Sequence, residues 1–480
     1  MYFNSIEFAI FLPIVFIVYW FVTSYNLKLQ NFFVLAASYF FYGWWDWRFL
    51  SLIIISSLVD YSVGIAFSKT ENTRKRKTLL WLSIFVNIGF LGFFKYYNFF
   101  VDNFVHAFTF FGNEINPNTL NIILPVGISF YTFQTLSYSI DVYYKKLEPT
   151  KNAIAFFAFV GFFPQLVAGP IERASNLLPQ FYKKRVFEYE KATDGMRQIL
   201  WGLFKKIVIA DNCATYANDI FANYHDYSGS TLFLGAVFFA FQIYGDFSGY
   251  SDIAIGTARL FGFNLMQNFA FPYFSRDIAE FWRRWHISLS TWFRDYVYIP
   301  LGGSKGRTWL IIRNVFAIFL ISGFWHGANW TFLIWGFLNA LYFLPLMIFK
   351  QNRRNLKHIN KQKLLPSFKE FLQMGATFLL TVLAWIFFRA ENVTHAFLYL
   401  DRIFSSSILS TPEVMPAKVI ILIALLMIVE WLQRDKLHAL QIGNYPIPIY
   451  ARWCFYYSLV LIIFIMGNFS SNYEFIYFQF

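Results

Sequence analysis

The stretch SGFWHGANWTFLIWG, residues 322–336, decides the kind of fold this chain can adopt, because it sets one ionisable side chain in an apolar run. That side chain is His326, and aromatic, aliphatic and small residues surround it. Ionisable residues at membrane depth are rare and face the interior of a helix bundle or a water-filled cavity. Gly323, Gly327 and Asn329 disfavour a continuous helix, so we expect a helix break beside His326, inside the protein.

The whole chain has the composition of an integral membrane protein. Of its 480 residues, 57% are hydrophobic, 23% are aromatic and 14% are charged, whereas soluble domains carry about 25% charged residues. The net charge of +13 comes from lysine and arginine in short loops, which predicts a role in topology and no nucleic-acid partner. Cys213 and Cys454 have no CxxC or Cys/His spacing, so we expect no disulfide, no metal site and no cysteine nucleophile.

Apolar segments of membrane-spanning length recur from one end of the sequence to the other. They are 6–22, 31–45, 48–67, 79–101, 120–140, 153–169, 196–211, 231–262, 309–322, 329–349, 371–388, 418–432 and 453–468. We expect an all-α polytopic membrane protein with about 11–12 transmembrane helices, plus re-entrant and interfacial helices. The sequence has no internal repeat, so residues 1–480 are expected to form a single integral-membrane domain.

Charged loops predict the topology. The loops at 69–77 and 145–151 are basic, whereas 102–119 contains no lysine or arginine. By the positive-inside rule the N-terminus lies outside, and counting the crossings puts the C-terminus outside as well. Residues 153–169 are expected to dip into the membrane and return, since Pro164 and its neighbours break a helix.

A second stretch, EFWRRWHISLSTWFRDYVYIPLGG, residues 280–303, falls in a loop that this topology places in the cytoplasm. As a helix, it would carry tryptophans on one stripe and His286 with arginines on another. This pattern predicts an interfacial amphipathic helix whose arginines meet lipid phosphates. Alternatively His286 belongs to a site, in which Arg283, Arg284 and Arg294 bind a phosphate or a phosphopantetheine arm.

The stretch FQIYGDFSGYSDIAIG, residues 241–256, places Asp246 and Asp252 in an apolar span. Buried carboxylates are costly unless they are paired. We therefore expect a cationic partner, such as an arginine of the 283–294 helix, and a structural role in orienting that helix.

His326 itself allows two hypotheses. A buried histidine can bond to a neighbouring helix and hold the bundle together. It can also act as a general base, because burial keeps the imidazole neutral, and a neutral imidazole accepts a proton from a hydroxyl that attacks a carbonyl. Burial alone does not decide between the two.

The motifs taken together resemble the bacterial membrane-bound O-acyltransferase (MBOAT) family, in the branch that acetylates exopolysaccharides such as alginate. The motifs are SYFFYGWW at 38–45, FQIYGDFSGYSDIAIG at 241–256, EFWRRWHISLSTWFRDYVYIPLGG at 280–303, FWHGANWTFLIWG at 324–336 and FIYFQF at 475–480. The resemblance implies a ring of transmembrane helices with a thinned centre, in the bacterial cytoplasmic (inner) membrane. It also implies that His326 is the family's intramembrane histidine and His286 its second histidine.

The resemblance further implies acyl transfer across the bilayer for O-acetylation of an exopolysaccharide or cell-wall glycan. The donor would be a cytoplasmic thioester, acetyl-CoA or an acyl carrier protein, with no cofactor bound permanently and no metal. Asn329 or backbone amides would stabilise the oxyanion. The expected partners are the lipid bilayer, an exported acetyltransferase and an extracellular or periplasmic polysaccharide.

The C-terminal stretch NYEFIYFQF, residues 472–480, contains no lysine or arginine and is expected outside. From composition it would be an aromatic segment resting at the outer interface. The resemblance offers an alternative, in which Tyr477 receives the acyl group before passing it on and the tail folds back towards His326. A phenol needs a neighbouring base to become nucleophilic, and its aryl ester is then a good acyl donor.

Three other functions remain open at this stage. D-Alanyl transfer to teichoic acid uses a carrier-protein donor and belongs to the same class. A lipid acyltransferase of the eukaryotic type fits the motifs less well. A transporter or flippase would also place polar residues in many helices, although no repeat supports it.

Overall fold

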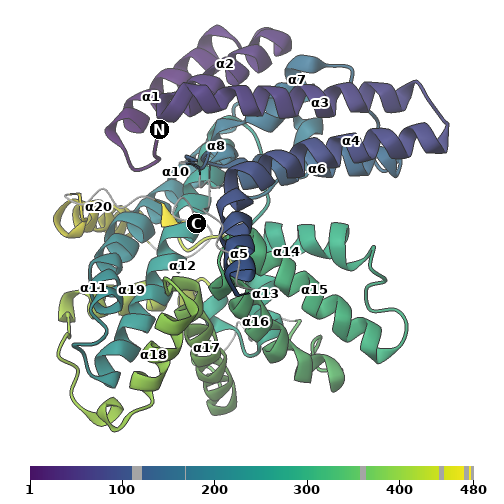
Figure 1. Ribbon diagram of the computed structural model, residues 1–480. Helices are drawn as coiled ribbons and strands as arrows, with labels where there is room; N and C mark the ends of the chain where they lie inside the picture. Colours follow the sequence, from purple (N-terminus) through teal and green to yellow (C-terminus); the bar gives the residue numbers. More distant parts are fainter. Residues whose placement is uncertain are drawn as a thin grey trace. The chain divides into compact units, whose positions relative to one another are not determined.

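The computed structural model describes residues 1–110, 120, 122–167, 169–356, 364–442, 448–469 and 475–476 (Figure 1). Within these residues every regular element is a helix and no strand occurs, which confirms the all-α prediction. The chain divides into two compact units, Met1–Ala192 with Thr257–Met266, and Thr193–Gly256 with Gln267–Phe480. The single domain expected over residues 1–480 stays a prediction.

The first unit contains the N-terminal helices. They are α1 (Ile6–Ile17), α2 (Leu27–Asp46), α3 (Leu50–Ser68), α4 (Thr73–Leu91), α5 (Tyr97–Phe110), α6 (Ile128–Tyr143), α7 (Ala153–Gly161), α8 (Phe163–Leu166) and α9 (Ala174–Leu177). Asparagine side chains cap three of them: Asn26 caps α2, Asn72 caps α4 and Asn152 caps α7, each by accepting hydrogen bonds from main-chain N–H groups.

The second unit holds the rest of the chain. Its helices are α10 (Tyr189–Leu203), α11 (Asp211–Ala222), α12 (Gly229–Leu260), α13 (Ile278–Arg284), α14 (Ile287–Phe293), α15 (Thr308–His326), α16 (Trp330–Ile348), α17 (Phe368–Arg389), α18 (Val393–Ile403), α19 (Ala417–Leu432) and α20 (Ile449–Met466). Two helices, α10 and α12, have residues in both units. Two π-helical segments matter below, η5 (Phe204–Ala210) between α10 and α11, and η7 (Arg294–Tyr298) after α14.

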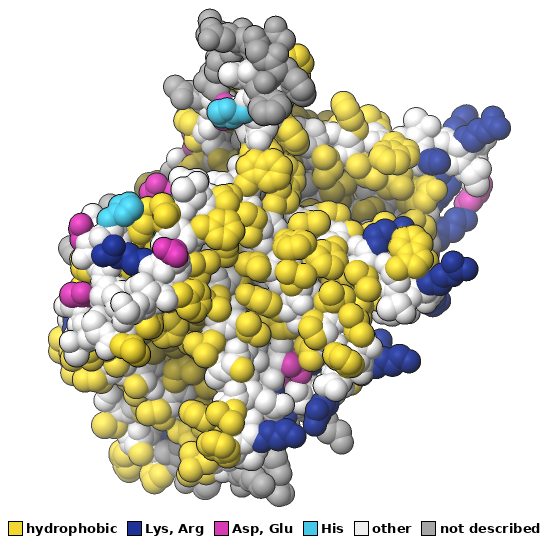
Figure 2. Space-filling model, turned by 60° about the horizontal axis from the view of Figure 1, so that its bottom comes forward, with side chains coloured by type: hydrophobic (Ala, Val, Ile, Leu, Met, Phe, Trp, Pro, Cys, Tyr) yellow, Lys and Arg dark blue, Asp and Glu magenta, His cyan; other side chains and the backbone are white. Residues whose placement is uncertain are grey.

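Seven helical segments in the described part of the chain are long and apolar enough to cross a bilayer. They are Leu27–Ser68, Thr73–Thr109, Gly229–Leu260, Thr308–His326, Trp330–Ile348, Phe368–Arg389 and Ile449–Met466. The first has 42 residues, about twice what one crossing needs, and it turns at Asp46, so it accommodates both of the spans expected at 31–45 and 48–67. Hydrophobic side chains cover much of the face in Figure 2, as expected of a multi-pass membrane protein.

The span expected at 120–140 begins later than the hydropathy suggested. Helix α6 starts at Ile128, because Pro125 and Gly127 precede it and Gly127 has a φ of +76°, which only glycine adopts without strain. Within this segment, residues 153–166 form two short helices, α7 and α8, with an interruption at Phe162 and with Pro164 in the first turn of α8. The helix break expected there is confirmed, and its re-entrant course stays a prediction.

A buried carboxylate holds three helices of the first unit together. Asp60 of α3 is fully buried and accepts hydrogen bonds from Ser83 and Asn87 of α4 and from Ser139 of α6. The oxygen of Asn87 accepts from Thr135 of α6 in turn. In apolar surroundings such a network specifies which helix faces meet, since each donor would otherwise be buried without an acceptor.

We predict that Asp60→Ala destabilises the protein. It removes the acceptor of three buried donors, and each unsatisfied buried group costs about 1–3 kcal/mol. The thermal unfolding midpoint in detergent should fall by about 4 °C or more. Asp60→Asn, which keeps an acceptor oxygen, should lose less, and Glu71→Ala, at an exposed ion pair with Lys145, should leave the midpoint unchanged. An unchanged midpoint in Asp60→Ala would contradict this role.

Candidate active site

The segment that contains His286 is not one helix. Helix α13 ends at Arg284, Trp285 is extended, and His286 has a φ of +43° before α14 begins at Ile287. The continuous amphipathic helix expected over 280–303 is therefore wrong. A left-handed non-glycine residue costs about 1 kcal/mol, and main-chain hydrogen bonds of 2.9 Å from Ala270 to Arg284 and from Ile287 to Asn268 hold the break in place.

This break changes where His286 lies. On one long helix it would share a surface stripe with the arginines, but in the structure only 1% of its surface is exposed. Its ring packs against Phe247 of α12 at 4.6 Å between centroids. Burial lowers the pKa of His286 to about 3, so the imidazole is neutral at physiological pH.

His326 lies at the end of α15, where the sequence predicted a break. The chain turns through Gly327 and Asn329, and α16 starts at Trp330. The two helices approach closely through glycines: a Cβ on Gly323 would lie 2.3 Å from the carbonyl oxygen of Phe332, and one on Gly336 would lie 2.4 Å from that of Phe319. This contact fixes His326, which is 4% exposed, against α16.

The two histidines lie near one another in an aromatic environment. Their ring centroids are 6.5 Å apart, and the ring of Trp325 lies 6.1 Å from His286 and 4.9 Å from His326. Trp335 and Phe388 pack against His326 at 5.1 and 5.3 Å. Two histidine rings at this separation can both contact one small reacting group, in surroundings that exclude bulk water.

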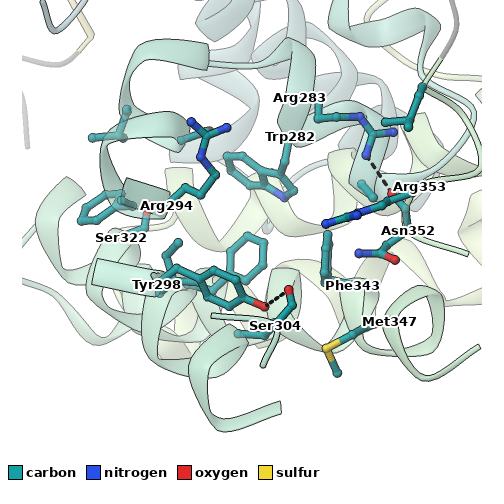
Figure 3. Close-up of a pocket in the computed structure, with 18 residues that line it drawn as sticks. Trp282, Arg283, Arg294, Tyr298, Ser304, Ser322, Phe343, Met347, Asn352 and Arg353 are labelled. Atoms are coloured by element: carbon teal, nitrogen blue, oxygen red, sulfur yellow. Dashed lines mark hydrogen bonds between the residues drawn. The ribbon is translucent and has the colours of Figure 1, made fainter. Parts of the chain in front are cut away.

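A cavity of about 340 Å³ opens on the other side of this aromatic layer (Figure 3). Arg283, Arg294 and Arg353 line it together with Tyr298, Ser304 and Asn352, and its deeper wall is apolar, with Phe319, Phe343 and Met347. Ser322, also in the wall, lies one helical turn before His326 on α15. An apolar cavity with cationic side chains suits a thioester arm that carries phosphates.

Tryptophan side chains link the cavity to His326. Trp282 lines the cavity and packs against Trp335 with 5.7 Å between ring centroids, and Trp335 packs against His326. The cavity therefore ends one aromatic layer away from the histidine.

Two of the three predicted arginines line this cavity, and the third does not. Arg284 is 7% exposed and forms an ion pair of 2.7 Å with Glu280, so it stabilises α13. Arg353 was missed, because it lies in a basic loop after α16 that looked like a topology signal alone. Only the fold of the second unit brings that loop to the cavity.

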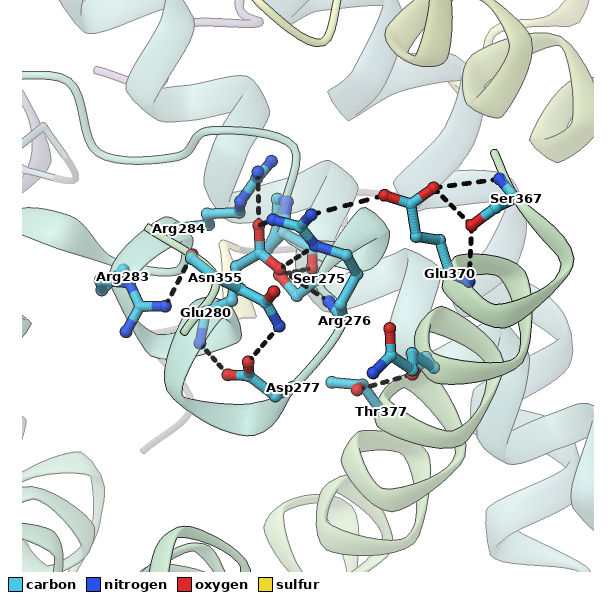
Figure 4. A network of polar contacts seen from close by, with 12 residues as sticks. Ser275, Arg276, Asp277, Glu280, Arg283, Arg284, Asn355, Ser367, Glu370 and Thr377 are labelled. Carbon is cyan, nitrogen blue, oxygen red and sulfur yellow. Dashed lines mark hydrogen bonds and ion pairs between the residues drawn. The ribbon is translucent and has the colours of Figure 1, made fainter. Parts of the chain in front are cut away.

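A polar network holds the cavity wall (Figure 4). Arg276 pairs with Glu280 at 3.0 Å and with Glu370, at the start of α17, at 3.5 Å. Asn355 donates to Asp277 at 2.6 Å, and Arg283 donates to the carbonyl oxygens of Asn352 and Asn355. The loop that carries Arg353 is thereby attached to α13.

The carboxylates of α12 pair with lysines instead of the expected arginines. Lys206 lies 2.7 Å from Asp246 and 2.8 Å from Asp211, and Lys205 lies 2.6 Å from Asp252. Both lysines belong to η5, whose wider turn presents these neighbouring side chains to α12. The arginine partner expected from the 283–294 helix is therefore wrong for Asp246, and a role of Asp246 in orienting that helix stays a prediction.

Asn329 and Tyr477 are the remaining predicted site residues. The Asn329 amide is already engaged: it accepts from the N–H of Thr331 and donates to the carbonyl oxygen of Glu391, which makes it the cap of α16. Tyr477 lies outside the described residues. The two residues before it, Phe475 and Ile476, are buried in the second unit, at 0% and 2% exposure.

Two other histidines are enclosed within the second unit. His438 is 1% exposed and lies 3.0 Å from Asp194, and His395 stacks on Tyr224. His225 is exposed, and His358 lies outside the described residues.

Comparison with known proteins places this geometry in context. A family model described as MBOAT, membrane-bound O-acyltransferase family, matches residues 150–385, which include both histidines and the cavity wall. Among named relatives, the probable alginate O-acetylase AlgI of Pseudomonas aeruginosa is 42% identical over 79% of this chain and 70% of its own length. The peptidoglycan O-acetyltransferase of Helicobacter pylori is 36% identical over 80% of this chain and 76% of its own. The teichoic acid D-alanyltransferase of Bacillus subtilis is 28% identical over 52% of this chain and 63% of its own length.

We predict that Gly323→Ala disrupts the site by separating α15 from α16. A Cβ 2.3 Å from a main-chain oxygen has no flexible atom to displace, so the helices must move. The thermal unfolding midpoint should fall by several degrees. The matched control is Gly375→Ala, in the spanning helix α17, where nothing lies within 4 Å of an added Cβ. That change should be neutral or stabilising by about 0.5–1 kcal/mol. Equal midpoints for the two variants would contradict the close-contact interpretation.

Proposed function

Because this chain belongs to the membrane-bound O-acyltransferase family and is an O-acyltransferase, we propose that it transfers an acetyl group from a cytoplasmic thioester across the bacterial inner membrane. The acetyl group is destined for an exopolysaccharide or a cell-wall glycan. The observation that carries the proposal is the pair of buried histidines, 6.5 Å apart, beyond the end of an arginine-lined cavity. Membership of an acyltransferase family argues against the transporter hypothesis.

His326 acts as the general base. Its neutral imidazole takes the proton of the acceptor hydroxyl as the hydroxyl oxygen attacks the thioester carbonyl carbon. The C–S bond then breaks, and the departing thiolate takes up that proton to leave as a thiol while the new ester forms. His286, neutral and on the other side of the reacting group, orients the carbonyl or assists the proton transfer.

The donor occupies the cavity. Arg283, Arg294 and Arg353 bind the phosphates of acetyl-CoA or of a carrier protein's phosphopantetheine, and the apolar wall receives the arm. The arm reaches His326 when Trp282 and Trp335 move apart. No permanently bound cofactor or metal takes part in this scheme.

The acceptor of the first transfer is Tyr477. Its phenol attacks the thioester, and the resulting aryl ester passes the acetyl group to an exported acetyltransferase, which completes transfer to the polysaccharide. The burial of Phe475 and Ile476 in the same unit as the histidines supports a tail that returns to the site. We favour acetyl over D-alanyl transfer because the two O-acetylating relatives are 42% and 36% identical and the D-alanyltransferase 28%.

The test of this proposal is Tyr477→Phe in membranes supplied with radiolabelled acetyl-CoA. The substitution keeps the ring and removes the nucleophile, so labelling of the external polymer should fall to background. The purified wild-type chain should carry an acetyl ester on Tyr477 by mass spectrometry. Full polymer labelling in Tyr477→Phe would exclude the relay.

We predict that His326→Ala abolishes acetyl transfer while the protein still accumulates in membranes. Removal of a general base typically lowers the rate by about 10²–10⁴-fold. His225→Ala, at an exposed turn, is the control and should retain full activity. His326→Ala membranes with more than about a tenth of wild-type activity would argue for a purely structural histidine.

We predict that Arg353→Ala weakens donor binding. The loss of one charge-assisted contact to a phosphate costs about 1.5–3 kcal/mol, so the KM for acetyl-CoA should rise by about tenfold or more while kcat changes little. Arg354→Ala is the matched control, since Arg354 is the exposed neighbour that does not line the cavity. If the two variants share one KM, the cavity is not the donor site.

A further inference from the structure

The last described residues of the chain are held by specific contacts in the second unit. The main-chain N–H of Ile476 donates to Oδ2 of Asp246 at 2.7 Å, and both residues are buried. The ring of Phe475 lies 4.6 Å from Tyr250 and 5.7 Å from Phe247, measured between centroids. A carboxylate and two aromatic rings of α12 therefore form a seat for residues 475–476.

A lysine fixes the carboxylate of this seat. Nζ of Lys206 lies 2.7 Å from Oδ1 of Asp246, so one carboxylate oxygen binds the lysine and the other binds the tail. Lys206 also pairs with Asp211 at 2.8 Å and lies 5.7 Å from the centre of the Tyr250 ring. With the lysine side chain 1% exposed, Asp246 has little freedom to turn away.

The start of the C-terminal segment is held by the same part of the fold. The carbonyl oxygen of Met466 accepts a hydrogen bond of 2.9 Å from Asn212. The N–H of Asn468 donates to the carbonyl oxygen of Ile207 at 3.3 Å. The helical segment that supplies Lys206 thus contacts the chain directly after α20, and through Lys206 it also supports the seat of residues 475–476.

The seat lies next to the histidine pair. Phe247, which contacts Phe475, also contacts His286 at 4.6 Å. Tyr477 follows Ile476 in the sequence, so whatever holds Ile476 limits the reach of the Tyr477 hydroxyl.

We propose that Asp246, braced by Lys206, is a positioning residue that docks the C-terminal segment through the Ile476 N–H and so presents the residue after it to the histidines. The proposal rests on the function proposed above for the relay, but docking itself is a separate property. Asp246 does not line the cavity proposed for the donor. Its carboxylate recognises the main chain of the tail, and the Phe247–Tyr250 pair recognises the Phe475 ring.

Cysteine labelling of the full-length chain tests the docking. Ile476→Cys keeps the N–H and the Phe475 ring, and it is combined with Cys454→Ser because Cys454 is exposed. In this background N-ethylmaleimide should label position 476 slowly. Adding Asp246→Ala should raise that rate by about tenfold or more, as loss of a charge-assisted hydrogen bond predicts. Asp246→Ala leaves Lys206 paired with Asp211, which favours retention of the fold.

Two features of the chain serve as controls. Asp252→Ala removes a matched aspartate of α12 that pairs with Lys205 and, in the described part of the chain, forms no hydrogen bond with Phe475 or Ile476, so position 476 should stay protected. Cys213 is fully buried in the same unit, and its labelling reports unfolding. If Asp246→Ala exposes Cys213, that variant has unfolded and Phe475→Ala becomes the test of docking. Phe475→Ala alters only the tail, and it should also raise labelling at position 476.

Continued protection of position 476 in folded Asp246→Ala, or in Phe475→Ala, overturns the docking proposal. Tyr477→Phe separates docking from relay, because it should leave position 476 protected whether or not acetyl transfer survives. Docking is therefore tested by labelling at position 476, and the relay is tested by acetyl transfer to the polymer.

Discussion

The contact between α15 and α16 through Gly323 and Gly336 is the interaction on which the candidate site depends. With no side chain on either glycine, the helices approach so closely that a Cβ at Gly323 or Gly336 would overlap a main-chain oxygen of the other helix, and the turn between them must then be tight. His326 ends the first helix at that turn, and Trp335 on the second lies against its ring. A membrane interior offers little hydrophobic force to bring helices together, so close packing of small residues has to do so. The position of the histidine follows from that packing.

The low polarity of the interior explains the charge states and the partners of the ionisable groups. Burial lowers the pKa of His286 and keeps its imidazole neutral, whereas the lysines of η5 are each matched to a carboxylate of α12 or α11. Near the site, Arg294 is exposed at the cavity and pairs with Asp295, whereas the buried Arg284 is paired with Glu280. The charged groups around the site are therefore either satisfied within the fold or available to an anionic ligand.

Two separate approaches converge on the histidines within the second unit. The cavity reaches His326 from one side through Trp282 and Trp335, and the seat of Phe475 reaches His286 from another through Phe247. An aromatic side chain closes each approach, so neither gives bulk water an open path to the rings. This arrangement would protect the thioester of the proposed reaction, because water would otherwise compete with the acceptor hydroxyl.

The sequence by itself determined the membrane class, the all-α fold, the family and the two histidines, because hydropathy and local motifs are properties of neighbouring residues. It also located the break beside His326, since Gly327 and Asn329 disfavour helix locally. The tertiary structure alone decided what depends on distant contacts. It broke the helix at His286, where main-chain hydrogen bonds from Ile287 to Asn268 and from Ala270 to Arg284 outweigh an amphipathic pattern, and it turned that side chain inward. It gave Asp246 a lysine partner and brought Arg353 to the cavity, because residues far apart in the sequence meet only once the helices have packed.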